Sequence, residues 1–199
     1  MKNSLQLEEL LKKFNITLFE NQDIFDFFNL PDNSSVIDIF PERIHSNEKY
    51  SFVEMFYQRV LDKEIELSKF ECVENKFVEL IKTLWLYNDV YVSVFSNINT
   101  INKNYYYKRN KTFFKEYSKS LLEMTESIDQ AFLIDDVNLL EALCIIATRD
   151  IATLMFCFNN SKAIIFLNDC AARVHFAENA DIDLFNKVVG NNGLYMHSL

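Results

Sequence analysis

Hydrophobic residues recur at intervals of three and four along much of this chain, which is the spacing of one face of an α-helix. One such set is formed by Phe114, Tyr117, Leu121, Met124, Ile128 and Phe132. A second set follows it and is formed by Leu140, Cys144, Ala147, Ile151, Leu154 and Phe158. Neighbouring helices with seams of this kind are typical of an antiparallel pair. The pattern therefore predicts a central pair of helices over residues 110–134 and 137–159.

Similar spacing predicts helices elsewhere. A short helix near the N-terminus is indicated by Leu7, Leu10, Leu11 and Phe14, and a longer one spans residues 73–99. Ser51 and Glu54 have the spacing of a capping box, and Ser161 is a candidate cap for a later helix. Asp181 is expected to cap a last, short helix that ends at Gly190. Asp135 and Asp136 precede the helix predicted at 137, where they favour its dipole.

The distribution of glycine and proline supports the same fold class. The chain has two prolines, Pro31 and Pro41, and two glycines, Gly190 and Gly193, so residues 42–189 contain neither. These residue types supply the backbone angles of hairpins and tight turns. We therefore expect a single all-α domain over residues 1–199, a bundle of six to eight helices. In it a short-helix region at 1–45 packs on a bundle at 46–199. Residues 36–40 and 89–96 are β-branched and apolar, which leaves one or two very short strands open.

Composition places the chain among soluble globular proteins. Hydrophobic residues make up 49% of it and aromatic residues 15%, enough for a packed core. The first residues carry charges too closely spaced for a signal peptide, and no apolar run approaches the roughly 20 residues of a membrane span. The four cysteines, mostly within apolar segments, are expected to be reduced thiols. The sequence thus predicts a cytoplasmic protein that does not contact a membrane.

Charge is the feature that says most about function. The formal net charge is -9, yet residues 81–120 carry an excess of Lys and Arg, whereas residues 121–199 are strongly acidic. An acidic protein is a poor binder of nucleic acid, because phosphate contacts need a positive surface. It is better suited to a basic protein, since opposite fields accelerate encounter. The residues predicted to bind such a partner are Glu123, Glu126, Asp129, Asp135, Asp136, Glu178, Asp181 and Asp183.

Catalytic and ligand-binding motifs are scarce. Phosphate loops require glycines that residues 42–189 do not have, and the cysteines lack the paired spacing of zinc sites. No cofactor or metal is therefore predicted.

Two charged positions remain notable. Arg149 and Asp150 interrupt an apolar segment, which favours a buried polar stripe with Glu141 and Thr148. His175 is expected to be a partly buried histidine satisfied by Glu178.

Three functions fit these observations. The first is a stoichiometric protein-binding protein, specifically a bacterial immunity protein or antitoxin that neutralises a basic toxin through its acidic surface and is not an enzyme. The second is an enzyme or ligand carrier with a site inside the bundle, using Arg149, Asp150, His175 or Tyr87. The third is a structural or regulatory partner in an assembly, using the basic, Tyr-rich segment around Lys108, Arg109 and Lys111. We expect the first.

Overall fold

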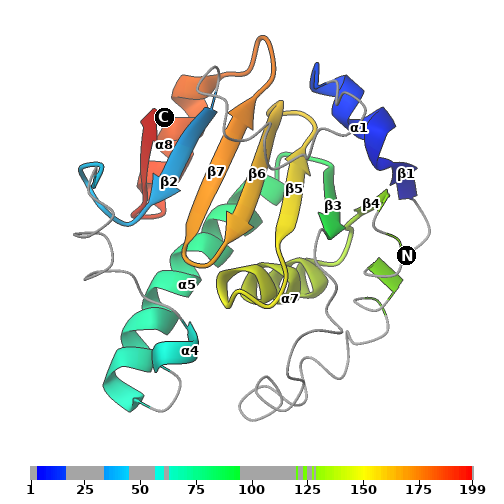
Figure 1. Ribbon diagram of the computed structural model, residues 1–199. Coiled ribbons are helices and arrows are strands. Elements are labelled where there is room, and N and C mark those ends of the chain that lie inside the picture. Colours follow the sequence, from blue (N-terminus) through cyan, green and yellow to red (C-terminus); the bar gives the residue numbers. More distant parts are fainter. Residues whose placement is uncertain are drawn as a thin grey trace.

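The dominant element of the protein is an antiparallel sheet, seen in a computed structural model that describes residues 4–16, 34–44, 57–60, 63–94, 120, 123–124, 127 and 129–198 (Figure 1). The strands are β1 Ser4–Gln6, β2 Ser34–Asp38, β3 Val90–Val94, β4 Gln130–Leu133, β5 Leu154–Phe158, β6 Ala163–Asn168, β7 Ala171–Phe176 and β8 Tyr195–Ser198. The helices are α1 Leu7–Lys13, α4 Tyr57–Val60, α5 Glu64–Trp85, α7 Val137–Thr148 and α8 Ile182–Asn191.

All eight strands belong to one sheet with the order β1-β4-β3-β5-β6-β7-β2-β8. Every pairing is antiparallel. Strands β5, β6 and β7 are consecutive hairpins in the middle of the sheet, whereas β2 comes from the N-terminal part and inserts between β7 and β8. Because neighbours run in opposite directions, β4, β5 and β7 end at the same end of the sheet at which β3 and β6 begin.

Both faces of the central strands are buried, which explains why these strands are apolar throughout. One face carries Phe156, Ile165 and Val174 and packs against helices α5, α7 and α8. The other carries Met155 and Ile164, which contact α1. Figure 1 shows α5 and α7 crossing behind the sheet. A strand covered on two sides reads as a continuous hydrophobic run rather than as an alternating one.

The predicted all-α bundle is therefore wrong. The helix expected over 137–159 ends at Thr148, and its last two seam positions, Leu154 and Phe158, lie on β5. Most of the helix expected over 110–134 lies outside the described residues, and its last positions form strand β4. The helix expected after Ser161 is replaced by β6 and β7. A uniformly apolar run contains residues at both the helical and the strand period, so spacing alone does not separate the two.

The turns explain why the absence of glycine misled the fold prediction. Asp150, Lys162, Asp169 and Asn179 have positive φ angles between 52° and 64°, in the left-handed region that glycine usually occupies. Lys162 lies in the turn between β5 and β6, and Asp169 lies in the turn between β6 and β7. Asn and Asp tolerate this conformation better than other side chains, because their short polar groups bond locally. The hairpins are thus built without glycine.

Several local predictions are confirmed. Helix α1 forms where the N-terminal spacing placed it, and α8 follows Asp181, whose side chain accepts a hydrogen bond from the Leu184 amide at 2.9 Å. Both stretches left open as short strands contain strands, β2 and β3. The helix expected over 73–99 is α5, which begins at Glu64 and ends at Trp85. The capping box at Ser51 lies outside the described residues. No helix in the described part of the chain is long and apolar enough to cross a membrane.

Candidate protein-contact surface

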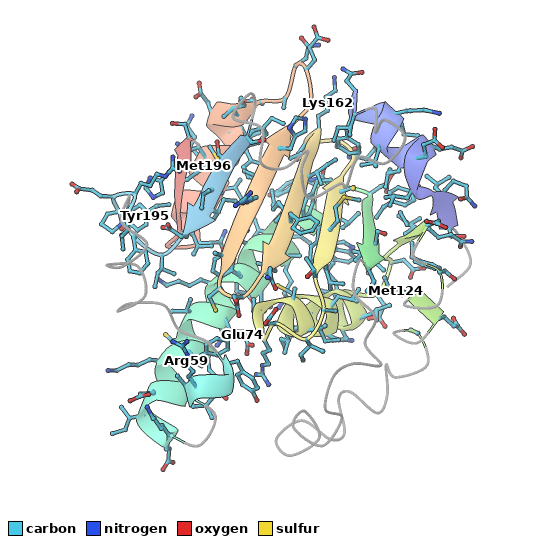
Figure 2. All side chains as sticks on the ribbon, in the orientation of Figure 1. Arg59, Glu74, Met124, Lys162, Tyr195 and Met196 are labelled. Carbon is cyan, nitrogen blue, oxygen red and sulfur yellow. The ribbon has the colours of Figure 1, made fainter. Side chains whose placement is uncertain are left out.

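Four chain connections meet at the end of the sheet where β4, β5 and β7 finish. They are residues 86–90, 134–135, 159–162 and 177–184, which together we call the rim. Backbone hydrogen bonds join each connection to the next: Ile134 N donates to Val90 O at 2.9 Å, Asn159 N to Asp89 O at 3.2 Å, and Ala177 N to Lys162 O at 2.9 Å. The rim is therefore one continuous structure assembled from segments far apart in the sequence (Lys162 is labelled in Figure 2).

Asn88 fixes the centre of the rim. Its buried side-chain nitrogen donates to Leu84 O at 2.7 Å and to Ser161 Oγ at 3.0 Å. Its side-chain oxygen accepts from Ser161 N at 2.7 Å. Asn160 adds a bond in the opposite direction, from its side-chain nitrogen to Tyr87 O at 2.8 Å. These bonds hold the connection after α5 against the hairpin between β5 and β6, so this part of the rim's backbone is constrained.

Exposed apolar side chains lie on two of the rim's connections. Leu86 is 69% exposed and Tyr87 is 71% exposed. On the other side of the hairpin, at the start of α8, Ile182 is 44% and Leu184 57% exposed. Among the described residues the exposed large hydrophobic side chains are six, and these four belong to the rim. Exposed large apolar groups are one mark of protein contact sites, and here they form two pairs on the rim, Leu86 with Tyr87 and Ile182 with Leu184.

The same surface carries an excess of negative charge. The rim contains five carboxylates, those of Asp89, Asp135, Glu178, Asp181 and Asp183, and one basic residue, Lys162. Within the described residues none of these five takes part in an ion pair. Asp181 is engaged as the cap of α8, and the other four are exposed and available to a second molecule.

The structure separates the eight acidic residues singled out from the sequence. Asp135, Glu178, Asp181 and Asp183 lie on the rim, and Asp136 follows directly, where its side chain caps α7 by accepting from Asn138 N at 2.9 Å. Asp129 precedes β4 and so lies at the opposite end of that strand. Glu123 is exposed next to the buried Met124, and Glu126 lies outside the described residues. The basic, Tyr-rich segment around Lys108 also lies outside them.

Arg149 is buried in an ion pair away from the rim. Its Nε and Nη2 donate to the two carboxylate oxygens of Glu74, each at 2.7 Å, and its Nη1 donates to the Tyr57 hydroxyl at 3.2 Å. Thr148 Oγ1 donates to the same carboxylate at 3.1 Å. Burial by itself would lower the pKa of the guanidinium, but the hydrogen bonds and charge of Glu74 outweigh burial and raise it. Arg149 and Glu74 are 5% and 3% exposed.

This geometry gives Arg149 a structural role. The polar stripe predicted for it is correct for Thr148, but the counter-charge is Glu74 on α5, and the predicted member Glu141 contacts Lys82 at 3.5 Å. Its guanidinium is turned toward Glu74 and Tyr57 and is shielded from solvent. The arrangement does not favour the enzyme hypothesis that used Arg149.

His175 and Glu178, expected to pair, are placed differently. His175 is buried on β7, with its Nδ1 3.5 Å from the Ser34 hydroxyl on β2, whereas Glu178 is exposed on the rim. Burial lowers the pKa of the His175 imidazole. Residues three apart lie on the same face of a helix, which is why the two were expected to pair. Strand β7 ends between them, so His175 lies within the sheet and Glu178 lies in the connection that follows.

Sequence reasoning missed Leu86 and Asn88 and placed Tyr87 in a site inside a bundle, because it assigned all three to a long helix; Tyr87 is instead 71% exposed. The Asn88-Asp89 dipeptide is a turn signal that marks the end of α5.

Among the described residues, no group of three or more His, Cys, Asp or Glu side chains is arranged to hold a metal ion. Comparisons with protein families, with curated proteins and with solved structures found no match to this chain.

Proposed function

We propose that this protein is a stoichiometric binding protein that holds a basic partner against its rim, in the manner of a bacterial immunity protein or antitoxin. The observation that supports the proposal is the coincidence of two features on one constrained backbone. The rim carries four of the exposed large apolar side chains of the described residues, and it also carries five carboxylates against one lysine.

The two features serve different steps of binding. Carboxylates without ion-pair partners among the described residues attract a basic surface over a distance and accelerate encounter. Leu86, Tyr87 and Leu184 then contribute apolar area that is removed from water in the complex. Aromatic side chains are enriched among the residues that dominate interface energies, which makes Tyr87 the first candidate for such a role. Because Asn88 and Asn160 already order the backbone, little conformational entropy is lost on binding.

The test uses the product of the neighbouring gene, because a toxin and its immunity protein are normally encoded together. We expect this product to be basic, to inhibit growth when expressed alone and to form a stoichiometric complex when the two are co-expressed. The complex is measured by co-purification and by calorimetry. A neighbouring product that leaves growth unaffected would rule out the immunity role.

Two triple variants with the same change in charge then locate the interface. The first reverses Asp135, Glu178 and Asp183 to lysine, which leaves the cap at Asp181 intact. The control reverses Glu123, Asp129 and Asp150, which lie outside the rim. We expect the rim variant to weaken binding by about tenfold or more, through both lost attraction and new repulsion. Equal losses in the two variants would show that net charge, and not the rim, governs binding.

A second matched pair separates apolar contact from charge. Tyr87→Ala removes an exposed rim side chain, and Ile65→Ala removes an exposed side chain on α5, away from the rim. We expect Tyr87→Ala to raise the dissociation constant by about tenfold or more, the effect of a residue at the centre of an interface. Ile65→Ala should leave the constant unchanged. If the Ile65 variant binds as weakly as the Tyr87 variant, the contact surface lies elsewhere.

A further inference from the structure

Lys162 occupies a backbone position that lysine rarely adopts. Its φ of 52° lies in the left-handed region, where Cβ comes close to the following carbonyl oxygen. Asn and Asp offset this contact with local hydrogen bonds and glycine avoids it, whereas lysine does neither. The other described residues with a positive φ all belong to these three types: Asn15, Asp150, Asp169, Asn179 and Gly193. Lys162 is therefore the exception among them.

The turn itself does not explain the exception. Asn159 and Asn160 precede Ser161 and Lys162 between β5 and β6, and neither asparagine has a positive φ. A lysine required only for charge or solubility could stand at the exposed position of Asn159 without strain. Strained backbone positions are found preferentially at functional sites. The lysine at position 162 thus has a reason outside the turn.

The ammonium group of Lys162 is not used within the described part of the chain. Lys162 is exposed, and its Nζ forms no ion pair or hydrogen bond with a described residue. The five rim carboxylates therefore lie beyond ion-pair distance of Nζ. Its backbone, by contrast, is fixed, because its carbonyl accepts from Ala177 N at 2.9 Å. Figure 2 labels Lys162 at this end of the sheet.

Lys162 also lies between the two apolar pairs of the rim. The strand order places its hairpin between the connection before β3 and the connection after β7. On one side Asn160 bonds the hairpin to Tyr87 O at 2.8 Å. On the other side the bond from Ala177 joins Lys162 to the connection that carries the second apolar pair. A partner that covers both pairs must therefore cover Lys162 as well.

The chemistry of the partner at this point follows from desolvation. Covering Lys162 removes water from its ammonium group, which is costly unless a counter-charge takes the place of the water. The rim carboxylates do not supply one, so it has to come from the partner. The partner proposed for the rim is basic as a whole, and a carboxylate on it would be repelled by the rest of the rim. Such a carboxylate is tolerated only opposite Lys162.

We infer that Lys162 pairs with an aspartate or glutamate at the centre of the partner's basic surface, and that this pair fixes the orientation of the complex. The inference rests on the proposed function, because it assigns one contact within the interface proposed for the rim. It adds a requirement on the partner, since a basic surface without a central carboxylate leaves Lys162 covered and unpaired.

The test compares two variants with the same change in charge, titrated by calorimetry with the product of the neighbouring gene. Lys162→Asn removes the rim lysine, and Lys69→Asn removes an exposed lysine near the other end of α5. Attraction alone predicts that both variants bind a basic partner as tightly as the wild type or more tightly, because both become more acidic. We expect Lys162→Asn instead to bind more weakly by about tenfold or more, because the partner's carboxylate loses its cation.

A gain in stability separates this loss from unfolding. Asparagine suits the left-handed region better than lysine, so Lys162→Asn should raise the melting temperature by about 2–4 °C. To find the carboxylate, Lys162→Glu is combined with variants of the neighbouring gene's product in which single Asp or Glu residues are replaced by lysine. One of these should restore binding by about tenfold or more over Lys162→Glu with the unchanged product.

Three results would overturn the inference. They are binding by Lys162→Asn as tight as that of the wild type or tighter, a melting temperature that does not rise, and failure of every partner variant to restore the binding of Lys162→Glu. Failure of the proposed function gives a different result, the absence of a complex with the wild-type protein. That result removes this inference together with the interface.

Discussion

The two ends of the sheet use charged side chains in opposite ways. At the rim, carboxylates such as Asp135 and Glu178 stand in solvent without ion-pair partners among the described residues, next to exposed apolar groups. At the other end, where α7 leads into β5, Arg149 and Glu74 are buried and hydrogen-bonded to each other. Figure 2 labels Lys162 and Glu74 at these two ends. Charge that is paired and buried holds elements together, whereas charge left unpaired on the surface remains available to another molecule.

The buried end shows what the pairing accomplishes. Glu74 belongs to α5 and Arg149 to the end of α7, so their two short hydrogen bonds fix where these helices cross beneath the sheet. Tyr57 extends the contact to α4, with its ring 4.5 Å from the guanidinium carbon. Three helices thus depend on one cation, and removal of that cation should have the largest effect on stability.

The substitution expected to destabilise the protein most is Arg149→Ala, which tests whether the buried ion pair holds the fold together. It leaves the Glu74 carboxylate buried without its cation, a loss that costs about 3–5 kcal/mol of the free energy of unfolding. Urea denaturation measures it. As a control, the double variant Arg149→Met, Glu74→Met replaces the pair by apolar groups and should recover most of the loss. A single-variant loss below about 1 kcal/mol would mean that water reaches the site and that the pair is not buried in solution.

Asn88→Ala should have the next largest effect, because the rim also has a buried polar centre. The substitution leaves the amide of Ser161 and the carbonyl of Leu84 without the bonds that the side chain supplied, at a cost of about 2–3 kcal/mol. Thermal and urea unfolding measure it, and loosening of the rim should weaken partner binding as well. Asn160→Ala, which removes one exposed bond to Tyr87 O, is the matched control and should cost about 0.5–1 kcal/mol. If both variants cost the same, Asn88 does not organise the rim.

How much of this fold the sequence predicts depends on whether a segment is amphipathic. Helices α1 and α8 alternate polar and apolar faces and have recognisable ends, and both are predicted correctly. Strands β5 and β6 are apolar at nearly every position, because α1 covers one face and α7 the other, so their period is hidden. The turns that would have revealed them use Lys162 and Asp169 in place of glycine. The hidden strand period and the turns without glycine have the same origin, because long-range packing sets the local conformation.

The candidate surface was predictable in part for a related reason. An acidic residue in a polar segment is generally exposed, so Asp135, Glu178 and Asp183 were identifiable from composition. Their location at the same end of the sheet as Leu86 and Tyr87 was not, since it depends on the strand order β4-β3-β5-β6-β7. The partner of Arg149 was hidden in the same way, because Glu74 lies 75 positions away in the sequence.

Smaller effects are expected where a carboxylate on the rim or directly beside it also caps a helix. Asp136→Ala and Asp181→Ala each remove a side chain that accepts a bond from a helix amide, and each should cost about 1 kcal/mol. Their neighbours Asp135→Ala and Asp183→Ala, which remove equal charge without removing a cap bond, should cost about half of this or less. Thermal unfolding of the four variants measures the difference. Equal destabilisation within each pair would show that charge near the helix, and not the cap bond, is what matters.

The smallest effect on stability is expected from Glu178→Lys. This substitution changes an exposed rim carboxylate and is therefore compared directly with Arg149→Ala, which changes a buried charge at the other end of the sheet. Glu178 is exposed, lies between β7 and α8, and takes part in no ion pair among the described residues. Reversal of its charge should change the free energy of unfolding by no more than about 0.5 kcal/mol, as for surface substitutions generally. The change also lowers the magnitude of a net charge of -9, which reduces self-repulsion. Urea denaturation at low and at high salt measures both contributions. A loss comparable to that of Arg149→Ala would show that the rim carboxylates hold the fold together, and the distinction between the two ends would then fail.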